Sequence, residues 1–330
     1  MKYNRIAITG GSGRLGRFVV EACARHSAVT VLDLKPDDSG HPFVELNVLD
    51  LKAVSRALEG HDAVIHLAAI DDAIDAPQKT YFETNVEGTF NVLQACFDLG
   101  IKRAAIASST SAIGLGHEKP AYEPRYYPID EAHPLNPHDA YSLSKQVCEV
   151  VARSFAVRGV TRIACLRPTL IVRHAVVAEL DNMAKLRAGD PAGDPNFDLS
   201  KVAEPFSEAL PMQRSYVMPE DVARCFRLAI EADDPPALDI VIVAAGDTIG
   251  QIHSLPHIER ELGHLAEVRK PDLYANDPTA SLLDSSHARD VLGWQAESTW
   301  ADVVAKYGAL PGKGLTSHRD CAGRTRQRAP

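Results

Sequence analysis

A tyrosine and a lysine stand four residues apart in the stretch Tyr141-Ser-Leu-Ser-Lys145, inside a segment that predicts a helix over 140–157. Four residues make about one helical turn, so the two side chains would share a face. A free tyrosine has a pKa of about 10, and a nearby ammonium lowers it by favouring the phenolate. The pair could therefore exchange a proton with a hydroxyl, although this spacing is also common on purely structural helices.

Hydroxyl side chains gather where a strand-like run, 102–108, ends. The stretch reads Ser108-Ser109-Thr110-Ser111 and is followed by Ala112-Ile113-Gly114. A hydroxyl in this place can hydrogen-bond a substrate oxygen and stabilise the charge that develops on it. Serine-rich segments are usually plain turns, so this one carries weight only beside the other motifs.

Three glycines, Gly10, Gly13 and Gly16, follow a short apolar run and open a helix-like segment that reaches about Ala24. Gly10 can adopt the angles of a tight turn, and Gly13 has no Cβ to block a phosphate. Gly16 would let the helix lie against the strand. The free N–H groups and the dipole at a helix start favour an anion. The alternative for an isolated glycine triplet is a flexible turn.

The next strand-like run, 29–34, carries Asp33 near its end. A carboxylate about 20 residues beyond such glycines is placed to bind the adenosine ribose hydroxyls of a dinucleotide. It would repel a 2′-phosphate, so the sequence favours NAD over NADP. Two basic residues, Arg14 and Lys35, lie close enough to weaken that preference.

Apolar runs alternate with helix-like segments through the first half of the chain. The expected strands are 6–8, 29–34, 43–46, 62–67, 102–108 and 161–167. The expected helices are 51–58, 78–99, which ends at Gly100, and 140–157. This alternation predicts an α/β fold with a Rossmann-type doubly wound parallel sheet, whose ligands lie at the carboxyl ends of the strands.

The second half of the chain is less regular. Helices are expected at 220–232 and 254–265, a strand at 239–244 and a loop at 188–198. We therefore expect an NAD-binding domain over 1–170 and a smaller C-terminal substrate lobe over 171–312, parts of which return to the first domain. Residues 313–330 form a basic tail that we expect to be disordered.

Composition narrows the class of protein. The chain has 330 residues, 45% of them hydrophobic, and a net charge of −9. That charge argues against nucleic acid as a partner, and no apolar run approaches the roughly 18 residues needed to span a bilayer. The six cysteines lie far apart and form no C-x-x-C pair. These features, together with a start that lacks a signal-like segment, favour the cytoplasm.

Taken in order, these motifs resemble those of the extended short-chain dehydrogenases/reductases of the NAD-dependent epimerase/dehydratase family. The similarity covers about 4–170 clearly and 212–305 loosely. It rests on Thr9-Gly-Gly-Ser-Gly-Arg-Leu-Gly16, Asp33, His66-Leu-Ala-Ala69, Asn85-Val-Glu-Gly-Thr89, Ser108-Ser109, Tyr141-x-x-x-Lys145, Leu166-Arg-Pro168 and Leu292-Gly-Trp294.

The resemblance implies roles for individual residues. Ser109 would be the catalytic hydroxyl, Tyr141 the acid/base, and Lys145 the residue that holds the nicotinamide ribose and tunes Tyr141. The implied NAD-binding residues are Gly10, Gly13, Arg14, Leu15, Gly16, Asp33, Asn47, Val48, Leu67, Ala68, Ala69, Asn85, Ser108, Tyr141, Lys145 and Pro168. The implied substrate-binding residues are Ser109, Thr110, Ser111, Tyr141 and Arg214. Helices 78–99 and 140–157 would form the surface of a homodimer.

The chain also departs from the family pattern. Asn47 replaces the usual adenine-contacting Asp, and its amide oxygen can still accept from an adenine amino group. Thr110 and Ser111 replace the Asp-Glu pair of the sugar-nucleotide dehydratases, which disfavours dehydration. Leu170 replaces an Asn that contacts the nucleotide in many members. Arg214 lies in a segment like the family's R-D-Y-I, and either binds a phosphate or carboxylate or is a surface residue.

Three functions remain open on these residues. The serine loop also resembles that of the uronate dehydrogenases, which favours net oxidation of a sugar or sugar acid. The second function is that of a sugar or sugar-nucleotide epimerase, and the third is that of a non-catalytic NAD-sensing regulator. No metal site is expected, because Pro256 separates His253 from His257 and no acidic or cysteine partner stands nearby.

Overall fold

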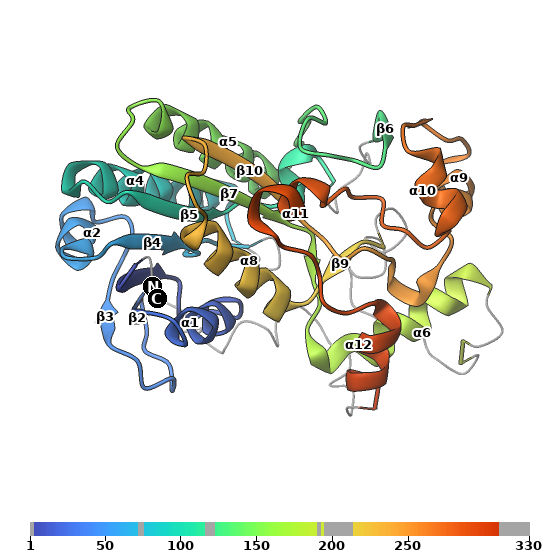
Figure 1. Cartoon of the computed structure of the whole chain (residues 1–330), viewed down its shortest axis with the longest axis horizontal. Helices are drawn as coiled ribbons and strands as arrows, with labels where there is room; N and C mark the ends of the chain where they lie inside the picture. The colour runs from blue at the N-terminus through green and yellow to red at the C-terminus, as the bar shows by residue number, and fades with distance from the viewer. Residues whose placement is uncertain (1–2, 72–75, 116–122, 190–192, 195–213, 310–330) are drawn as a thin grey trace, which may run out of the picture.

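A seven-stranded parallel sheet forms the centre of the computed structural model, which describes residues 3–71, 76–115, 123–189, 193–194 and 214–309. The strand order is β3-β2-β1-β4-β5-β7-β10, and every neighbouring pair is parallel (Figure 1). The strands are β1 (Arg5–Thr9), β2 (Ala28–Asp33), β3 (Phe43–Glu45), β4 (Ala63–His66), β5 (Arg103–Ala107), β7 (Arg162–Pro168) and β10 (Leu238–Val243). The chain order reverses between β1 and β4, so a crevice for ligands opens at their carboxyl ends. The predicted α/β fold is confirmed.

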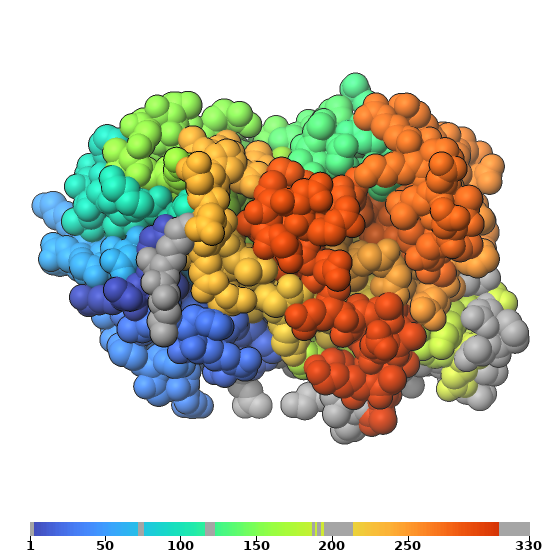
Figure 2. Space-filling view, viewed as in Figure 1, coloured from blue at the N-terminus to red at the C-terminus, as the bar shows by residue number. Residues whose placement is uncertain are grey.

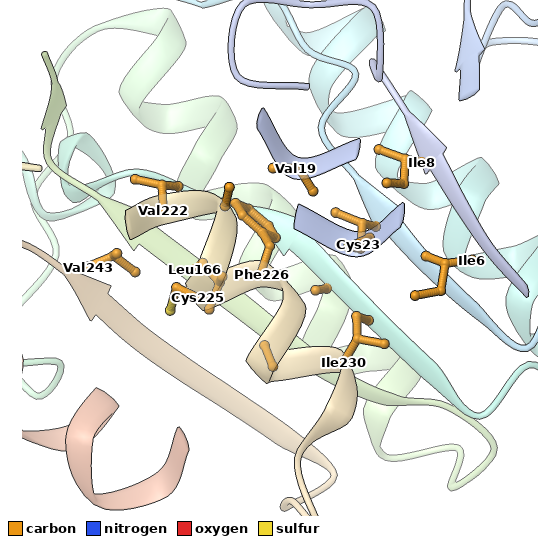
Figure 3. Close-up of a cluster of buried hydrophobic side chains, with 14 of the residues drawn as sticks. Ile6, Ile8, Val19, Cys23, Leu166, Val222, Cys225, Phe226, Ile230 and Val243 are labelled. Carbon is orange, nitrogen blue, oxygen red and sulfur yellow. The ribbon is translucent and has the colours of Figure 1, made fainter. Parts of the chain in front are cut away.

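Two layers of helices cover the sheet, which is why its strands are apolar on both faces. One layer contains α1 (Gly16–Ala24) and α8 (Pro219–Glu231), and the other contains α2 (Leu51–Leu58), α4 (Gly88–Leu99) and α5 (Ala140–Ala156). Ile6 and Ile8 of β1 face the first layer, where they join Phe226 of α8 in one buried cluster (Figure 3). Ala7 faces the second layer.

The segment 78–99 differs from the single helix that we predicted. It consists of α3 (Gln78–Tyr81), a π-helical stretch η1 (Phe82–Glu87) and α4, which ends at Gly100 with φ +70°. A π-helix adds one residue to a turn and changes the hydrophobic period too little to be recognised from sequence. The widened turn bears on the site because it contains Asn85.

A smaller lobe lies beside the sheet, where Figures 1 and 2 show its orange helices α9 and α10, the red α12 and the yellow-green α6. Its helices are α6 (Val177–Ala188), α9 (Ser254–Leu262), α10 (Pro271–Asn276) and α12 (Trp300–Tyr307). A further late helix that the sequence did not predict, α11 (Ser286–Leu292), packs on α8 and β10 of the main sheet instead. Two short parallel ladders complete the lobe: β8 (Leu170–Ile171) with β9 (Tyr216–Val217), and β6 (Tyr126–Tyr127) with β11 (Glu267–Val268). Of these helices, the sequence predicted only α9.

Residues 219–243 return from this lobe to the main sheet as α8 and β10. Most of the predicted loop 188–198, and all of the predicted tail 313–330, lie outside the described residues. In the part of the chain that the structure describes, no helix is both long and apolar enough to cross a membrane.

Candidate active site

The glycine turn brings three segments to contact distance at the crevice. Gly10 has φ +71°, and a Cβ on it would lie 2.6 Å from the backbone nitrogen of Ala68. A Cβ on Gly16 would lie 2.1 Å from the carbonyl oxygen of Gly10. Only glycine therefore allows the end of β1, the start of α1 and the loop after β4 to meet.

The start of α1 suits a phosphate. Leu15 occupies the N-cap position, no side chain caps the helix, and its first turn contains no acidic residue. Arg17 N and Phe18 N donate to Gly13 O and Leu15 O, so an anion would bind the N–H groups that precede them, and the helix dipole adds to the attraction. Gly13 is exposed at the rim of the turn, and Arg14 pairs with Asp71 from the loop after β4.

Asp33 stands beside this turn at the end of β2. One carboxylate oxygen accepts from Ser12 N at 3.1 Å and the other from Leu34 N at 2.7 Å, and the side chain is half-buried. Asn47 is exposed after β3, where its Oδ1 accepts from Leu49 N at 3.0 Å, and the neighbouring Val48 is buried. The residues expected to bind the adenosine half of NAD thus lie along one edge of the sheet.

Tyr141 and Lys145 share a face at the start of α5, as their spacing predicts. The Nζ atom of Lys145 lies 5.6 Å from the centre of the Tyr141 ring and donates to the carbonyl oxygen of Ala107 at 2.8 Å. Lys145 is buried, while Tyr141 is partly exposed and meets the ring of Tyr81 edge-on at 6.2 Å. The lysine therefore joins the end of β5 to the turn of α5 that carries Tyr141.

The two serines after β5 are held in different ways. The Ser109 hydroxyl accepts from Ser111 N at 3.1 Å and caps a short helix, η2 (Thr110–Ile113). Thr110 and Ser111 are both buried. The Ser108 hydroxyl donates to Glu149 Oε1 at 2.5 Å. Ser108 is thus bonded to α5, while Ser109 starts the turn that continues toward the smaller lobe.

Glu149 and Arg167 form a buried ion pair behind this loop, which the sequence did not predict. Arg167 donates from Nε and Nη2 to the two carboxylate oxygens at 2.8 and 2.7 Å. With Ser108 as a third donor, the carboxylate is well compensated for its burial. The available signal was the position of Glu149, four residues after Lys145 and therefore on the inner face of α5.

His66 forms a second polar link, at the end of β4. Its Nδ1 lies 2.6 Å from Thr9 Oγ1, and its Nε2 lies 3.2 Å from Thr89 Oγ1. Burial, helped by the charge of Lys145, lowers the pKa of His66 to about 3, so the ring is neutral at physiological pH. Because Thr89 donates onward to Asn85 O at 2.6 Å, we assign the ring proton to Nε2.

Arg214 lies in the smaller lobe and is not a surface residue, so that alternative is wrong. Its side chain is 2% exposed. The Nε atom donates to His257 Nε2 at 3.0 Å, and Nη1 donates to the carbonyl oxygen of Ala184 at 3.0 Å. His257 therefore serves as a packing partner, and the described residues contain no cluster of three His, Cys, Asp or Glu that could hold a metal.

Pro168 ends β7 beside the serine loop, and its carbonyl oxygen lies 3.5 Å from Thr110 Oγ1. Leu67, Ala68 and Ala69 are all partly exposed at the crevice after β4. The carboxyl edge of the sheet thus gathers the predicted glycine, acidic, serine and tyrosine–lysine motifs from β1, β2, β4, β5 and α5.

Comparison with known proteins agrees with this geometry. Residues 6–244 match the NAD dependent epimerase/dehydratase family, and the chain belongs to that family. It is thus an enzyme of the extended short-chain dehydrogenase/reductase type.

Two characterised relatives are sugar dehydrogenases by name. L-arabinose 1-dehydrogenase (NAD(P)(+)) of Haloferax volcanii is 29% identical over 266 residues, which cover 79% of this chain and 95% of that protein. Uronate dehydrogenase of Pseudomonas syringae pv. tomato is 28% identical over 155 residues, which cover 46% of this chain and 53% of that protein.

A solved structure shares the fold. The short-chain dehydrogenase/reductase superfamily protein of Agrobacterium tumefaciens, crystallised with bound NAD, superposes with a TM-score of 0.66 at 24% identity. The match covers 93% of this chain and 97% of that one. With the family assignment, the glycine turn and Asp33 fit NAD, which is the cofactor.

Asp33→Ala should narrow the difference in affinity between NAD and NADP by about 1–3 kcal/mol, the value of a hydrogen bond to a charged group. Calorimetric titration with each cofactor measures the change. Asp98→Ala on α4 removes an equal charge at a site where Asp98 accepts from Gln94 on the same helix, and should leave both affinities unaltered. Tighter NADP binding by the unaltered protein would contradict the role given to Asp33.

Proposed function

We propose that the chain is an NAD-dependent dehydrogenase that oxidises a hydroxyl-bearing carbon of a sugar, sugar acid or sugar derivative. The observation that carries the proposal is the Lys145 ammonium, which lies between Ala107 O and the Tyr141 ring where the serine loop begins. The relatives named as arabinose and uronate dehydrogenases support a sugar as the substrate.

The residues divide the work of oxidation as follows. The Tyr141 phenolate takes the hydroxyl proton, and Ser109 hydrogen-bonds the same oxygen while the carbonyl forms. The positive charge of Lys145 favours the deprotonated state of the tyrosine. The chemistry that NAD would supply when bound is acceptance of the hydride from the carbon. The bond from Lys145 to Ala107 holds the ammonium in place without neutralising it.

The same edge of the sheet would seat the cofactor. The glycine turn, with Arg14 and Leu15, would hold the pyrophosphate, and Asp33 the adenosine ribose. Asn47 and Val48 would flank the adenine, while Leu67–Ala69 and Pro168 would line the path to the nicotinamide. This arrangement follows the carboxyl ends of the strands around the crevice between β1 and β4.

Two other functions, an epimerase and a regulator that only senses NAD, differ from the dehydrogenase in whether a hydride is transferred and where it ends. An epimerase would return it to the sugar, and a 4-epimerase of Escherichia coli O157:H7 is also a relative, at 30% identity over 56% of this chain. Leu170, which replaces a nucleotide-contacting Asn, favours a substrate without a nucleotide. A regulator that only senses NAD would have no use for Ser109, Tyr141 and Lys145 together, so we place it last.

Arg214 is proposed to face an acidic group of the substrate. Its fork of N–H donors suits a carboxylate or a phosphate. The bonds to His257 and Ala184 hold its side chain within the smaller lobe, and they would set the direction of the fork.

We infer that two copies of the chain form a homodimer through α4 and α5. Leu143 and Val150 of α5, together with Val157 directly after its end, are exposed large apolar residues seven apart, which places them on one stripe. Phe90 and Leu99 of α4 are exposed as well, and α4 packs beside α5. A second copy that presents the same stripe would cover it by two-fold symmetry.

A cytoplasmic location completes the proposal. The described cysteines are all free and buried, and they are Cys23, Cys96, Cys148, Cys165 and Cys225. Burial raises the pKa of the Cys96 thiol to about 12, which keeps it unreactive. Reduced, unpaired thiols fit a reducing compartment.

Tyr141→Phe should lower turnover on the order of 10²-fold or more, because the general acid/base is lost while the ring remains. NAD affinity and the thermal midpoint should stay near those of the unaltered protein. Tyr307→Phe on α12, where the ring stacks on His174, is the matched control and should retain full turnover. Substantial activity in Tyr141→Phe would move the acid/base role to another residue.

The dehydrogenase should accumulate NADH in proportion to product when NAD and a substrate are mixed. Absorbance at the NADH band, followed against a panel of free sugars, sugar acids and nucleotide sugars, measures this. Inversion of a sugar without lasting NADH absorbance would instead establish the epimerase and leave the fold and the cofactor assignment unchanged.

Val150→Glu should convert the dimer to a monomer, because it places two like charges in the centre of an apolar interface. Light scattering coupled to gel filtration gives the mass in solution. Val150 is 59% exposed, and Val291→Glu on α11, at 39% exposed, is the control that should remain dimeric. A monomeric unaltered protein would rule out the dimer.

A further inference from the structure

His174 lies where three passages of the chain between the main sheet and the smaller lobe meet. The first passage leaves β7 through β8 and a short helix, η3 (His174–Val176), and continues into α6. The second returns through β9 and α8, and the third runs from α11 to α12. Because β8 pairs with β9, the outgoing and returning segments lie side by side shortly before His174 and α8. A side chain at this crossing can contact both parts of the molecule.

On the side of the smaller lobe, the His174 ring stacks on the end of α12. It lies almost parallel to the ring of Tyr307, with the ring centres 4.0 Å apart and an angle of 7° between the planes. Tyr307 is the last residue of α12 and packs against the buried apolar cluster that contains Leu180 and Trp300. The stacked rings thus join the start of η3 to the core of the lobe.

On the side of the main sheet, the neighbour of His174 is Phe18 in the first turn of α1. The two rings meet edge-on, with their centres 5.9 Å apart and their planes at 90°. Phe18 packs against the apolar cluster of the main sheet, and its backbone N–H donates to Leu15 O at 3.0 Å. Its ring is therefore tied to the turn whose N–H groups face the pyrophosphate of the cofactor.

A charged residue completes the surroundings of His174. The Nε2 atom lies 2.9 Å from Glu220 Oε1, in the first turn of α8. The His174 side chain is 26% exposed and that of Glu220 is 49% exposed, so water screens this contact and it adds little stability. It is also an ion pair only when the ring is protonated, whereas the two ring contacts persist in either protonation state.

We propose that His174 is a positioning residue, which links the first turn of α1 to α12 through the rings of Phe18 and Tyr307. When NAD occupies the glycine turn, the start of α1 is restrained, and the three rings carry this restraint to the end of α12. The ends of elements absorb most of the motion between two parts of a protein, and His174 stands at such an end. NAD thus sets the place of the smaller lobe before a substrate arrives.

The link between NAD and α12 does not depend on the proposed function, because it requires only that NAD binds, and NAD is the cofactor. The effect on turnover does rest on the proposed function. A measurement with NAD alone therefore tests the link even if the substrate or the reaction differs from the one proposed.

Hydrogen–deuterium exchange with and without saturating NAD tests the link. In the unaltered protein, peptides covering 300–307 should exchange several-fold more slowly when NAD is bound. His174→Ala and Tyr307→Leu should both lose this slowing, while peptides covering 16–24 should keep it in all three proteins. General destabilisation would raise exchange with and without NAD alike, so a purely structural role would leave the effect of NAD in place.

Three further variants serve as controls, and calorimetry gives the saturating concentration of NAD for each. His174→Phe retains a ring that can meet both neighbours, and it should retain the slowing at 300–307. Glu220→Gln removes only the charge of the ion pair and should retain the slowing as well. His26→Ala removes the same side chain from an exposed position beyond the other end of α1, and should match the unaltered protein.

The consequence for turnover can be measured once a substrate is known. His174→Ala should raise KM for that substrate roughly twofold to tenfold, the range that one aromatic pair is worth. The value of kcat should stay close to that of the unaltered protein, because Ser109, Tyr141 and Lys145 all belong to the main sheet and its helix α5. His174→Phe should restore most of the KM.

Either of two results would overturn the proposal: exchange at 300–307 that does not respond to NAD in the unaltered protein, or a slowing that persists in His174→Ala. Loss of the slowing in Glu220→Gln would overturn it too, since the ion pair and not the rings would then form the link. Should His174→Ala fail to fold, the comparison of Tyr307→Leu with His174→Phe decides alone.

Discussion

The buried ion pair between Glu149 and Arg167 fixes the register of the whole site. It joins α5 to β7, and the hydroxyl of Ser108 adds β5 as the third element. Removing one partner of such a pair leaves an uncompensated buried charge, at a cost of about 3–5 kcal/mol. The serine loop and the tyrosine–lysine turn therefore cannot shift against each other without breaking this contact, and their mutual placement does not depend on a ligand.

On the other side of the crevice, a neutral histidine, His66, links two further elements by hydrogen bonds. Because His66 cannot hold a proton on both nitrogens at ordinary pH, it accepts from Thr9 and donates to Thr89, and so joins β1 to α4 with a defined direction. The glycine contacts then fix the backbone between these two polar links. An ion pair thus joins α5 to β7, a neutral histidine joins β1 to α4, and the steric contacts of the glycines fix the loops between them.

The sequence predicted what is local and repeated. Strands buried on both faces, the carboxylate at the end of β2 and the one-turn spacing of Tyr141 and Lys145 follow from residue type and period alone. Contacts between distant segments did not follow: the Glu149–Arg167 pair and the His257 partner of Arg214 depend on which helix packs on which strand. The π-helical turn was not predicted, because one added residue changes the spacing of apolar residues too little to be distinguished from an ordinary α-helix. The helices α6, α10, α11 and α12 are short or weakly amphipathic, and tertiary packing decides their structure.

The return of the chain to the sheet through α8 and β10 determines when, during synthesis, the apolar core of the sheet can be completed. Phe226 of α8 and Val243 of β10 complete the same apolar cluster as Ile6, Ile8 and Val19 (Figure 3). A nascent chain that has emerged only to β7 still lacks α8, so of the two described helices in that layer only α1 can cover this face of the sheet. The nucleotide-binding half is contiguous in space but not in sequence, and its apolar cluster also takes in Ala288 and Trp294. The cluster therefore cannot be complete before these late residues have been synthesised.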